Sequence, residues 1–236
     1  FYNVDGLPDL WKAMQAGNAG PALWQAFSVE TFEALVHIAC ASVWILPVIG
    51  LGPRGRWGYL VFSCLLHIVN LKLFYYAYAH DHSIDGGILG FIGWSVPTLL
   101  GTLVCDAVRE NPAPWAQWRR MGGWAVGFML AGYALACLNL WHAPADGHTG
   151  LARVLVEPPF VPPTRPVDMW TMDQQIASPS YILFGGGFSL VVYLVFVTVS
   201  DGFGRAVRVF STLGLNPLFG YVYHTIVGAF VAQFIQ

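Results

Sequence analysis

The stretch SYILFGGGFSLVVYLVFVTVS, residues 180–200, contains no charged side chain. A helix needs about 20 mostly apolar residues to cross the hydrocarbon core of a bilayer, so this stretch predicts a membrane span. Five further stretches of similar length and composition occur along the chain. The six predicted spans lie near residues 32–52, 57–79, 86–107, 121–141, 180–200 and 212–235. The predicted fold class is therefore all-α, a bundle of about six transmembrane helices in a lipid bilayer.

The composition agrees with a membrane protein. Hydrophobic residues make up 56% of the chain and charged residues 10%, whereas soluble domains contain about 25% charged residues. The formal net charge of −2 provides no basic surface that could neutralise a phosphate backbone, so nucleic acid is excluded as a partner. The four cysteines lie in different apolar stretches without CxxC spacing, which indicates small buried residues rather than a disulfide framework.

Basic residues predict the orientation. Loops after the first, third and fifth stretches carry Arg54, Arg56, Arg109, Arg119, Arg120, Arg205 and Arg208. The other side carries only Lys12, Arg153 and Arg165. Because cytoplasmic loops are enriched in Lys and Arg, we expect the arginine-rich loops to face the cytoplasm and both ends of the chain to lie outside. Short loops without a disulfide pattern favour a bacterial inner membrane.

Two segments flank or interrupt the predicted spans. Residues 1–30 contain Trp11 and Trp24 among glycines and a proline, and we expect an interfacial segment there. Residues 31–236 form the transmembrane domain. Within it, residues 142–179 contain seven prolines, which exclude a regular helix or a central strand. We expect this external loop to fold back over the outer mouth of the bundle.

Glycines recur at spacings typical of helix packing. Gly86 with Gly90, Gly123 with Gly127, and the run at residues 185–187 would allow close approach of helix backbones. Packing within the bundle is the favoured interpretation of these small residues.

Ionisable side chains inside predicted spans require partners, because a charge at the centre of a bilayer costs about 3 kcal/mol on insertion scales. Glu33 and His37 are one helical turn apart and predict a hydrogen-bonded pair. Lys72 lies two residues after Asn70 and five after His67. Two interpretations stay open for Lys72: its amine reaches upward to the interface, or it faces inward and binds a phosphate or carboxylate.

The outer loop at residues 80–85 contains two histidines and two aspartates. Without an evident third ligand this spacing does not predict a metal site. Asp85 precedes Gly86 and Gly87, and we expect it to cap the N-terminus of the next helix.

The last predicted span contains His224 at half its length. Pro217 can open the helix locally, and Asn216 then shares one face with Tyr223 and His224. A purely structural role of His224 is the alternative to a functional one.

Three short motifs occur in the order of a known family. They are DGGILG at residues 85–90, WTM at 170–172 with SPSY at 178–181, and GLNPL at 214–218 followed by Tyr221 and His224. Through these motifs the chain resembles the C-terminal portion of multi-span membrane acyltransferases typified by heparan-alpha-glucosaminide N-acetyltransferase. The catalytic histidine of that family lies in an earlier part of its chain, and members usually have about ten spans. We therefore expect residues 1–236 to be part of a longer polypeptide.

The resemblance implies transfer of an acetyl or other acyl group from acyl-CoA, bound from the cytoplasmic side, to a saccharide amine or hydroxyl on the far side. Imidazole suits this chemistry as a base or acyl carrier. The predicted site contains His224 and Asp85 for catalysis, and Asn216, Lys72, Arg119 and Arg120 for the coenzyme, without a metal. The alternative is a non-catalytic scaffold subunit, derived from such an enzyme, in a complex with other membrane chains.

Overall fold

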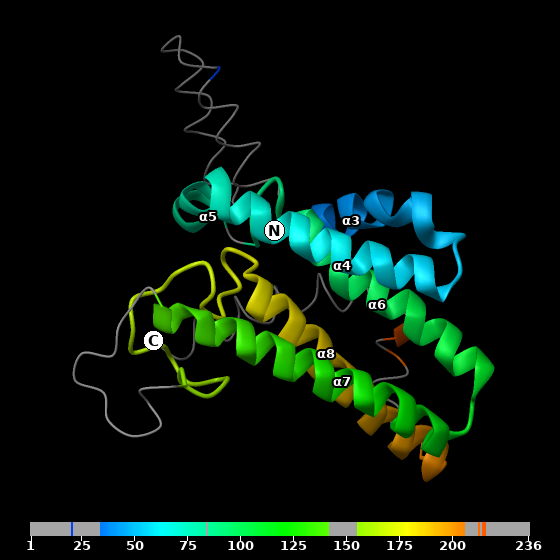
Figure 1. Cartoon of the computed structure of the whole chain (residues 1–236). Helices are drawn as coiled ribbons and strands as arrows, with labels where there is room; N and C mark the ends of the chain where they lie inside the picture. Colours follow the sequence, from blue (N-terminus) through cyan, green and yellow to red (C-terminus); the bar gives the residue numbers. More distant parts are fainter. Residues whose placement is uncertain are drawn as a thin grey trace.

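The computed structural model describes residues 20, 34–83, 85–141, 155–205, 212 and 214–215. Every regular element within these residues is a helix, which confirms the predicted all-α fold class for the described part of the chain. The helices are α3 (Ala34–Ile49), α4 (Pro53–Asn70), η2 (Leu71–Tyr75), α5 (Tyr76–His82), α6 (Gly90–Glu110), α7 (Pro114–Ala136), η3 (Cys137–Trp141), α8 (Pro179–Val197) and η5 (Thr198–Gly202) (Figure 1).

Four continuous helical segments are long and apolar enough to cross a membrane. They are Pro53–Asp81, Gly90–Glu110, Pro114–Trp141 and Pro179–Gly202. The predicted spans near 57–79, 86–107, 121–141 and 180–200 correspond to them. Of the first predicted span, near 32–52, the structure describes residues from Ala34 onward. There α3 ends at Ile49, before the helix-breaking sequence GLGP at 50–53 and three residues before the predicted end. The sixth, near 212–235, and the interfacial segment at 1–30 lie outside the described residues, apart from a few isolated positions.

Prolines set the beginning of three spans. Pro53, Pro114 and Pro179 occupy the first turn of α4, α7 and α8, where a missing backbone N–H is not needed. In α8 the preceding Ser178 is the N-cap, and its hydroxyl oxygen accepts a hydrogen bond from the Tyr181 backbone N–H at 3.2 Å. Each span therefore has a defined first residue.

Glycines bring α7 and α8 together. A Cβ atom at Gly132 would lie 2.6 Å from the Phe184 backbone nitrogen, and one at Gly187 would lie 2.6 Å from the Ala125 carbonyl oxygen. Gly187 thus agrees with the predicted packing role of the run at 185–187. A Cβ at Gly123 or Gly127 meets nothing within 4 Å among the described residues, so a packing role of these two glycines is not observed there.

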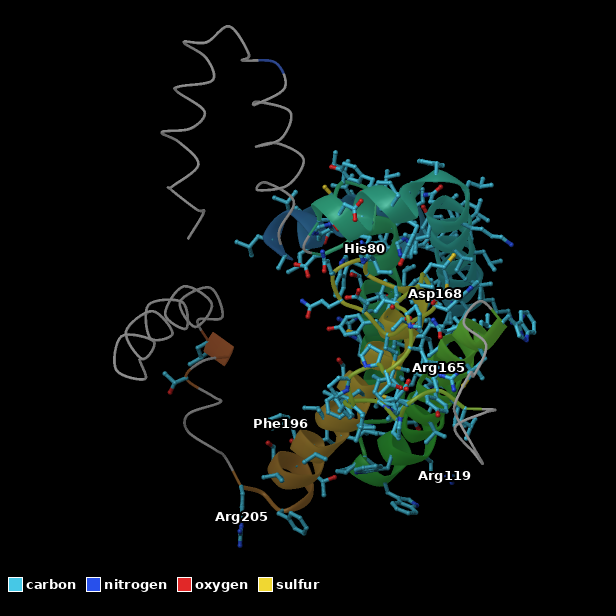
Figure 2. All side chains as sticks on the ribbon, turned by 90° about the vertical axis from the view of Figure 1, so that its left-hand side faces the viewer. His80, Arg119, Arg165, Asp168, Phe196 and Arg205 are labelled. Atoms are coloured by element: carbon cyan, nitrogen blue, oxygen red, sulfur yellow. The ribbon has the colours of Figure 1, made fainter. Side chains whose placement is uncertain are left out.

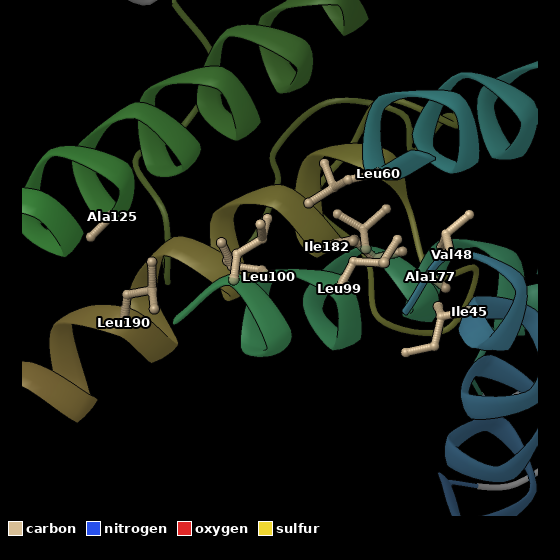
Figure 3. Packing of buried hydrophobic residues seen from close by; sticks show 11 residues of the cluster. Ile45, Val48, Leu60, Leu99, Leu100, Ala125, Ala177, Ile182 and Leu190 are labelled. Atoms are coloured by element: carbon tan, nitrogen blue, oxygen red, sulfur yellow. The ribbon is translucent and has the colours of Figure 1, made fainter. Parts of the chain in front are cut away.

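The apolar core connects α6 to its neighbours. Leu99 and Leu100 of α6 are buried together with Ile182 of α8 and Ile45 of α3 (Figure 3). The middle of α6 thus packs against the start of α8 and the second half of α3.

The bundle has two chemically different ends. At one end, which we call the arginine-bearing end, lie the α3–α4 loop, the α6–α7 loop and the end of α8 (Figure 1). A hydrogen bond of 2.6 Å from Trp118 Nε1 to Thr198 Oγ1 joins α7 to α8 there. At the other end, the acidic end, α5 and the start of α6 meet the segment 155–178, with Asp81, Asp85, Glu157, Asp168 and Asp173. His80, Asp168 and Arg165 lie apart from Arg119 and Arg205 (Figure 2).

Candidate functional site

A cavity of about 370 Å³ lies at the acidic end, beneath the proline-rich segment. We call it the loop cavity. The end of α7 with η3, the start of α8 and residues 156–172 surround it. Its lining residues are Ala136, Asn139, Val156, Glu157, Pro158, Pro159, Phe160, Val161, Pro162, Pro163, Arg165, Thr171, Met172, Tyr181 and Phe184. The described part of the loop, residues 155–178, contains turns and bends but neither helix nor strand.

Asn139 lines this cavity and joins the end of α7 to the loop. Its Nδ2 donates to the Pro166 carbonyl at 3.0 Å and to Thr171 Oγ1 at 3.2 Å. Its Oδ1 is buried and accepts no hydrogen bond from the residues that the structure describes. A buried acceptor without a donor costs about 1–3 kcal/mol, so the contacts of Nδ2 and the packing around Asn139 offset this cost.

Glu157 is ionised and holds its own loop closed. The Thr164 backbone N–H donates to Glu157 Oε1 at 3.2 Å, and the Thr164 hydroxyl donates to the same atom. Burial acts to raise the pKa of Glu157, but the hydrogen bonds from Thr164 and the nearby positive charge of Arg165 lower it below its ordinary value. A carboxylate charge therefore stays at the cavity wall at neutral pH.

Arg165 contributes a buried cation to the same wall, with 7% of its surface exposed. A guanidinium presents several fixed donors and is suited to bind hydroxyl, carboxylate or phosphate oxygens. The loop cavity thus contains one positive group, one negative group and an amide oxygen within an otherwise apolar lining.

Aromatic rings form the apolar side of the cavity. The Phe160 ring lies 5.7 Å from the Phe184 ring and 5.5 Å from the Phe188 ring, in edge-to-face arrangements. Phe160 has a backbone φ of 71°, which is strained for an aromatic residue and persists only where surrounding contacts fix it. Its contacts with α8 supply that constraint.

The predicted catalytic residue Asp85 lies next to the loop but does not line the cavity. Its Oδ1 accepts a hydrogen bond of 3.0 Å from Gln174 Nε2. The prediction that Asp85 caps the next helix was wrong, because α6 begins at Gly90 with Leu89 as its N-cap. Gly86 and Gly87 have φ values of 87° and 59°, and such left-handed residues do not continue a right-handed helix.

Backbone hydrogen bonds join the segment around Asp85 to the end of the proline-rich loop. Gly86 N–H donates to the Gln175 carbonyl at 2.8 Å, and the Ser83 hydroxyl donates to the same carbonyl at 2.9 Å. Residues about 90 positions apart in the chain are thereby held side by side.

Two buried histidines stabilise this arrangement. His37 Nε2 donates to the Gly87 carbonyl and His67 Nε2 donates to the Ala177 carbonyl, both at 2.8 Å. Gly90 and Gly93 leave room for them, since a Cβ there would lie 2.9 Å from His37 Nε2 and 3.0 Å from His67 Nε2. The predicted partner of His37, Glu33, lies outside the described residues.

The residues predicted to bind the coenzyme are not brought together. Lys72 is exposed on η2, toward the acidic end, so of the two open interpretations the inward-facing one is not observed. Arg119 is exposed at the start of α7, at the arginine-bearing end. Arg120, the next residue, forms an ion pair with Glu110. Its guanidinium carbon Cζ lies 5.3 Å from the centre of the Trp124 ring. Asn216 lies outside the described residues, as does the predicted catalytic residue His224.

Sequence reasoning pointed to the proline-rich loop but missed Asn139, Glu157 and Arg165. The available signal was the isolated opposite charges of Glu157 and Arg165 in a stretch of prolines and apolar residues. Asn139 gave no signal, because its partners come from a loop 27 and 32 residues further along the chain. Among the described residues, no group of three or more His, Cys, Asp or Glu side chains lies together in a way that would hold a metal.

No family model, curated protein or solved structure matches this chain. The functional interpretation therefore depends on the site itself and on the sequence motifs.

Proposed function

We propose that the protein is an integral membrane acyltransferase that moves an acetyl or other acyl group from acyl-CoA to a saccharide amine or hydroxyl. The observation that carries this proposal is the loop cavity. Its volume of about 370 Å³ lies within the range of roughly 300–1,000 Å³ that small-molecule sites occupy. Apolar walls with a few convergent polar groups are the general form of such sites.

A saccharide fits the lining of the loop cavity. One face of a sugar ring is apolar and packs against aromatic side chains such as Tyr181 and Phe184. Its hydroxyl or amine groups can donate to Glu157, and its oxygens can accept from Arg165. One wall of the loop cavity therefore offers both a hydrogen-bond acceptor and a hydrogen-bond donor to a sugar.

The proposed topology has six spans, with both ends of the chain outside and the arginine-bearing end toward the cytoplasm of a bacterial cell. The clustering of arginines at one end of the bundle supports this orientation. The loop cavity then faces the far side of the inner membrane, where a cell-envelope saccharide would reach it. Acyl-CoA would enter at the opposite end, near Arg119 and Arg120.

The reaction forms one bond and breaks another. The acceptor amine or hydroxyl attacks the thioester carbonyl, a C–N or C–O bond forms, and the C–S bond breaks. The acceptor proton passes to a base and then to the departing CoA thiolate, so the products are the acylated saccharide and CoA thiol. The family resemblance supports His224 as that base or as an acyl carrier, with Asp85 as a second catalytic group. Asn216 stays a proposed contact of the coenzyme on the same ground.

A non-catalytic scaffold subunit is the second candidate. One observation favours it: His37, His67 and Asp85 at the acidic end each form a hydrogen bond within the fold. Polar groups used in this way stabilise a structure without needing a substrate. Such a subunit would hold the helices of a larger membrane complex together.

An acetyl-transfer assay distinguishes the two candidates. The purified full chain in phosphatidylcholine vesicles is incubated with labelled acetyl-CoA and methyl β-D-glucosaminide, which offers both an amine and hydroxyls. We expect labelled acetyl-glucosaminide to form in proportion to the protein, with release of CoA thiol. A rate equal to that of protein-free vesicles would favour the scaffold subunit, which co-purification with other membrane chains would then support.

A further inference from the structure

The apolar side of the loop cavity continues onto the exposed surface of α8. Phe184 lines the cavity and contacts Phe160, which in turn contacts Phe188, one helical turn further along α8. Phe160 and Phe188 are both exposed. An unbroken aromatic surface therefore leads from the cavity wall to the outside of the bundle.

Beyond Phe188 this surface becomes a stripe along the span. Large apolar side chains are exposed at Phe188, Val192, Val195 and Phe196. Their spacing of four, seven and eight residues places them on one helical face. These side chains are exposed among the described residues, and α8 is long and apolar enough to cross a membrane, so we place this face against hydrocarbon. The stripe runs from about half the length of α8 toward its end at Val197.

Gly185 leaves open space beside this aromatic surface. Among the described residues, a Cβ atom at Gly185 meets nothing within 4 Å, whereas one at Gly187 would lie 2.6 Å from the Ala125 carbonyl oxygen. Packing against α7 therefore explains Gly187 but not Gly185. Gly185 precedes Val192 and Phe196 by seven and eleven residues, so by helical spacing it lies on the face of the stripe and adds no side chain there.

The loop cavity and the stripe together have the polarity of an amphiphile. Asn139, Glu157 and Arg165 provide the polar part at the loop cavity, and the aromatic rim leads to an apolar face in the membrane. We propose that the acceptor is a saccharide carried on a lipid, with its sugar in the loop cavity and its hydrocarbon chain along the α8 stripe beside Gly185. This inference rests on the proposed function, because it names the acceptor of the same site.

A water-soluble saccharide is the competing acceptor. In that case Phe160 only anchors the loop at the membrane interface, where aromatic side chains are generally enriched. The two cases differ in whether the alkyl chain of a bound glycoside contacts the protein.

Binding of two glycosides to the full-length chain in phosphatidylcholine nanodiscs decides between them. Methyl and dodecyl β-D-glucosaminide have the same sugar, and only the second has a hydrocarbon chain. The variant Gly185→Leu adds a side chain to the stripe at a position where a Cβ meets nothing within 4 Å among the described residues. Gly101→Leu on α6 is its matched control, since a Cβ there also meets nothing within 4 Å. Partition of the dodecyl compound into lipid is the same for every variant and cancels in the comparison.

We expect Gly185→Leu to weaken binding of dodecyl glucosaminide at least tenfold and to leave methyl glucosaminide binding unchanged, while Gly101→Leu affects neither. Equal binding of the dodecyl compound by the parent chain and Gly185→Leu would overturn the lipid-linked acceptor.

Acetyl transfer to the same two compounds is measured separately. Transfer to both without any effect of Gly185→Leu would keep the proposed function and overturn this inference. Selective loss of dodecyl binding without transfer to either compound would support the amphiphile site and overturn the acyltransferase.

Discussion

The two ends of the helix bundle are held together in different ways. At the arginine-bearing end, short loops join the helices and side chains pair across them, as Arg56 does with Asp106. At the acidic end, backbone groups of irregular segments form the hydrogen bonds. His67 donates to the Ala177 carbonyl, and the Gly86 backbone N–H donates to the Gln175 carbonyl. Backbone contacts of this kind fix the shape of the segments that surround the loop cavity. The arginine-bearing end has side-chain pairs between helices instead, so only the acidic end combines irregular backbone with the loop cavity among the described residues.

Among the predicted effects, replacement of the proposed catalytic residue His224 should change acetyl transfer most. We expect His224→Ala to reduce acetyl transfer by at least about 10²-fold, because general acid–base catalysis typically contributes 10²–10⁴-fold. The measurement is the initial rate of acetyl-glucosaminide formation in vesicles. His80→Ala is the control, since His80 is exposed and pairs only locally with the adjacent Asp81. Parent-like turnover of His224→Ala would remove this residue from the catalytic site.

Separation of α7 from α8 would affect both ends at once. We expect Gly132→Val to destabilise the fold by about 1–3 kcal/mol, the usual effect of overpacking, because its side chain would push against the Phe184 backbone. Gly123→Val on the same helix is the control, since a Cβ there meets nothing within 4 Å. Thermal unfolding in detergent measures the difference. Equal midpoints for the two variants would mean that α7 and α8 do not approach closely at Gly132.

The charge of Asp85 separates a catalytic from a structural role at the acidic end. Asp85→Asn keeps an oxygen that accepts the hydrogen bond from Gln174, so we expect stability to fall by no more than about 1 kcal/mol. If Asp85 acts in catalysis as proposed, transfer should fall about tenfold, which is about 1.4 kcal/mol. Asp201→Asn at the arginine-bearing end should not change the rate. An unchanged rate in Asp85→Asn would leave Asp85 with only its structural contact.

The sequence predicted the long helices well because lipid imposes a simple rule on them. A span needs about 20 apolar residues, and the four segments that follow this rule are helices in the structure. The first stretch was misjudged, since apolar residues continue past Pro47 while the helix ends at Ile49 before two glycines and Pro53. The composition of a stretch gives its average hydrophobicity, whereas the position at which a helix ends depends on individual residues.

The candidate site could be predicted only as a region. Seven prolines in residues 142–179 indicated an irregular external loop but not which side chains it would bury. Arg165, Asn139 and Glu157 meet because the loop returns to the end of α7, and these contacts depend on tertiary structure. Asp85 shows the same limit, because its partner Gln174 is 89 positions away in the chain.

The smallest expected effect concerns the ionisation of Glu157 in the loop cavity. Its folded-state pKa is lowered, since the hydrogen bonds from Thr164 and the charge of Arg165 outweigh the effect of burial. A lowered pKa stabilises the fold above the ordinary value of 4.5, and this stabilisation is lost as the pH falls through the lowered pKa. We therefore expect Glu157→Gln to unfold at a slightly lower temperature than the parent chain at pH 7, and this difference to shrink as the pH falls below 4.5. Thr164→Val, which removes the hydroxyl donor to Glu157, should shift the midpoint at pH 7 in the same direction. A pH-independent difference between Glu157→Gln and the parent would mean that the Glu157 carboxylate charge does not hold the loop, and that the acidic end depends on its backbone contacts alone.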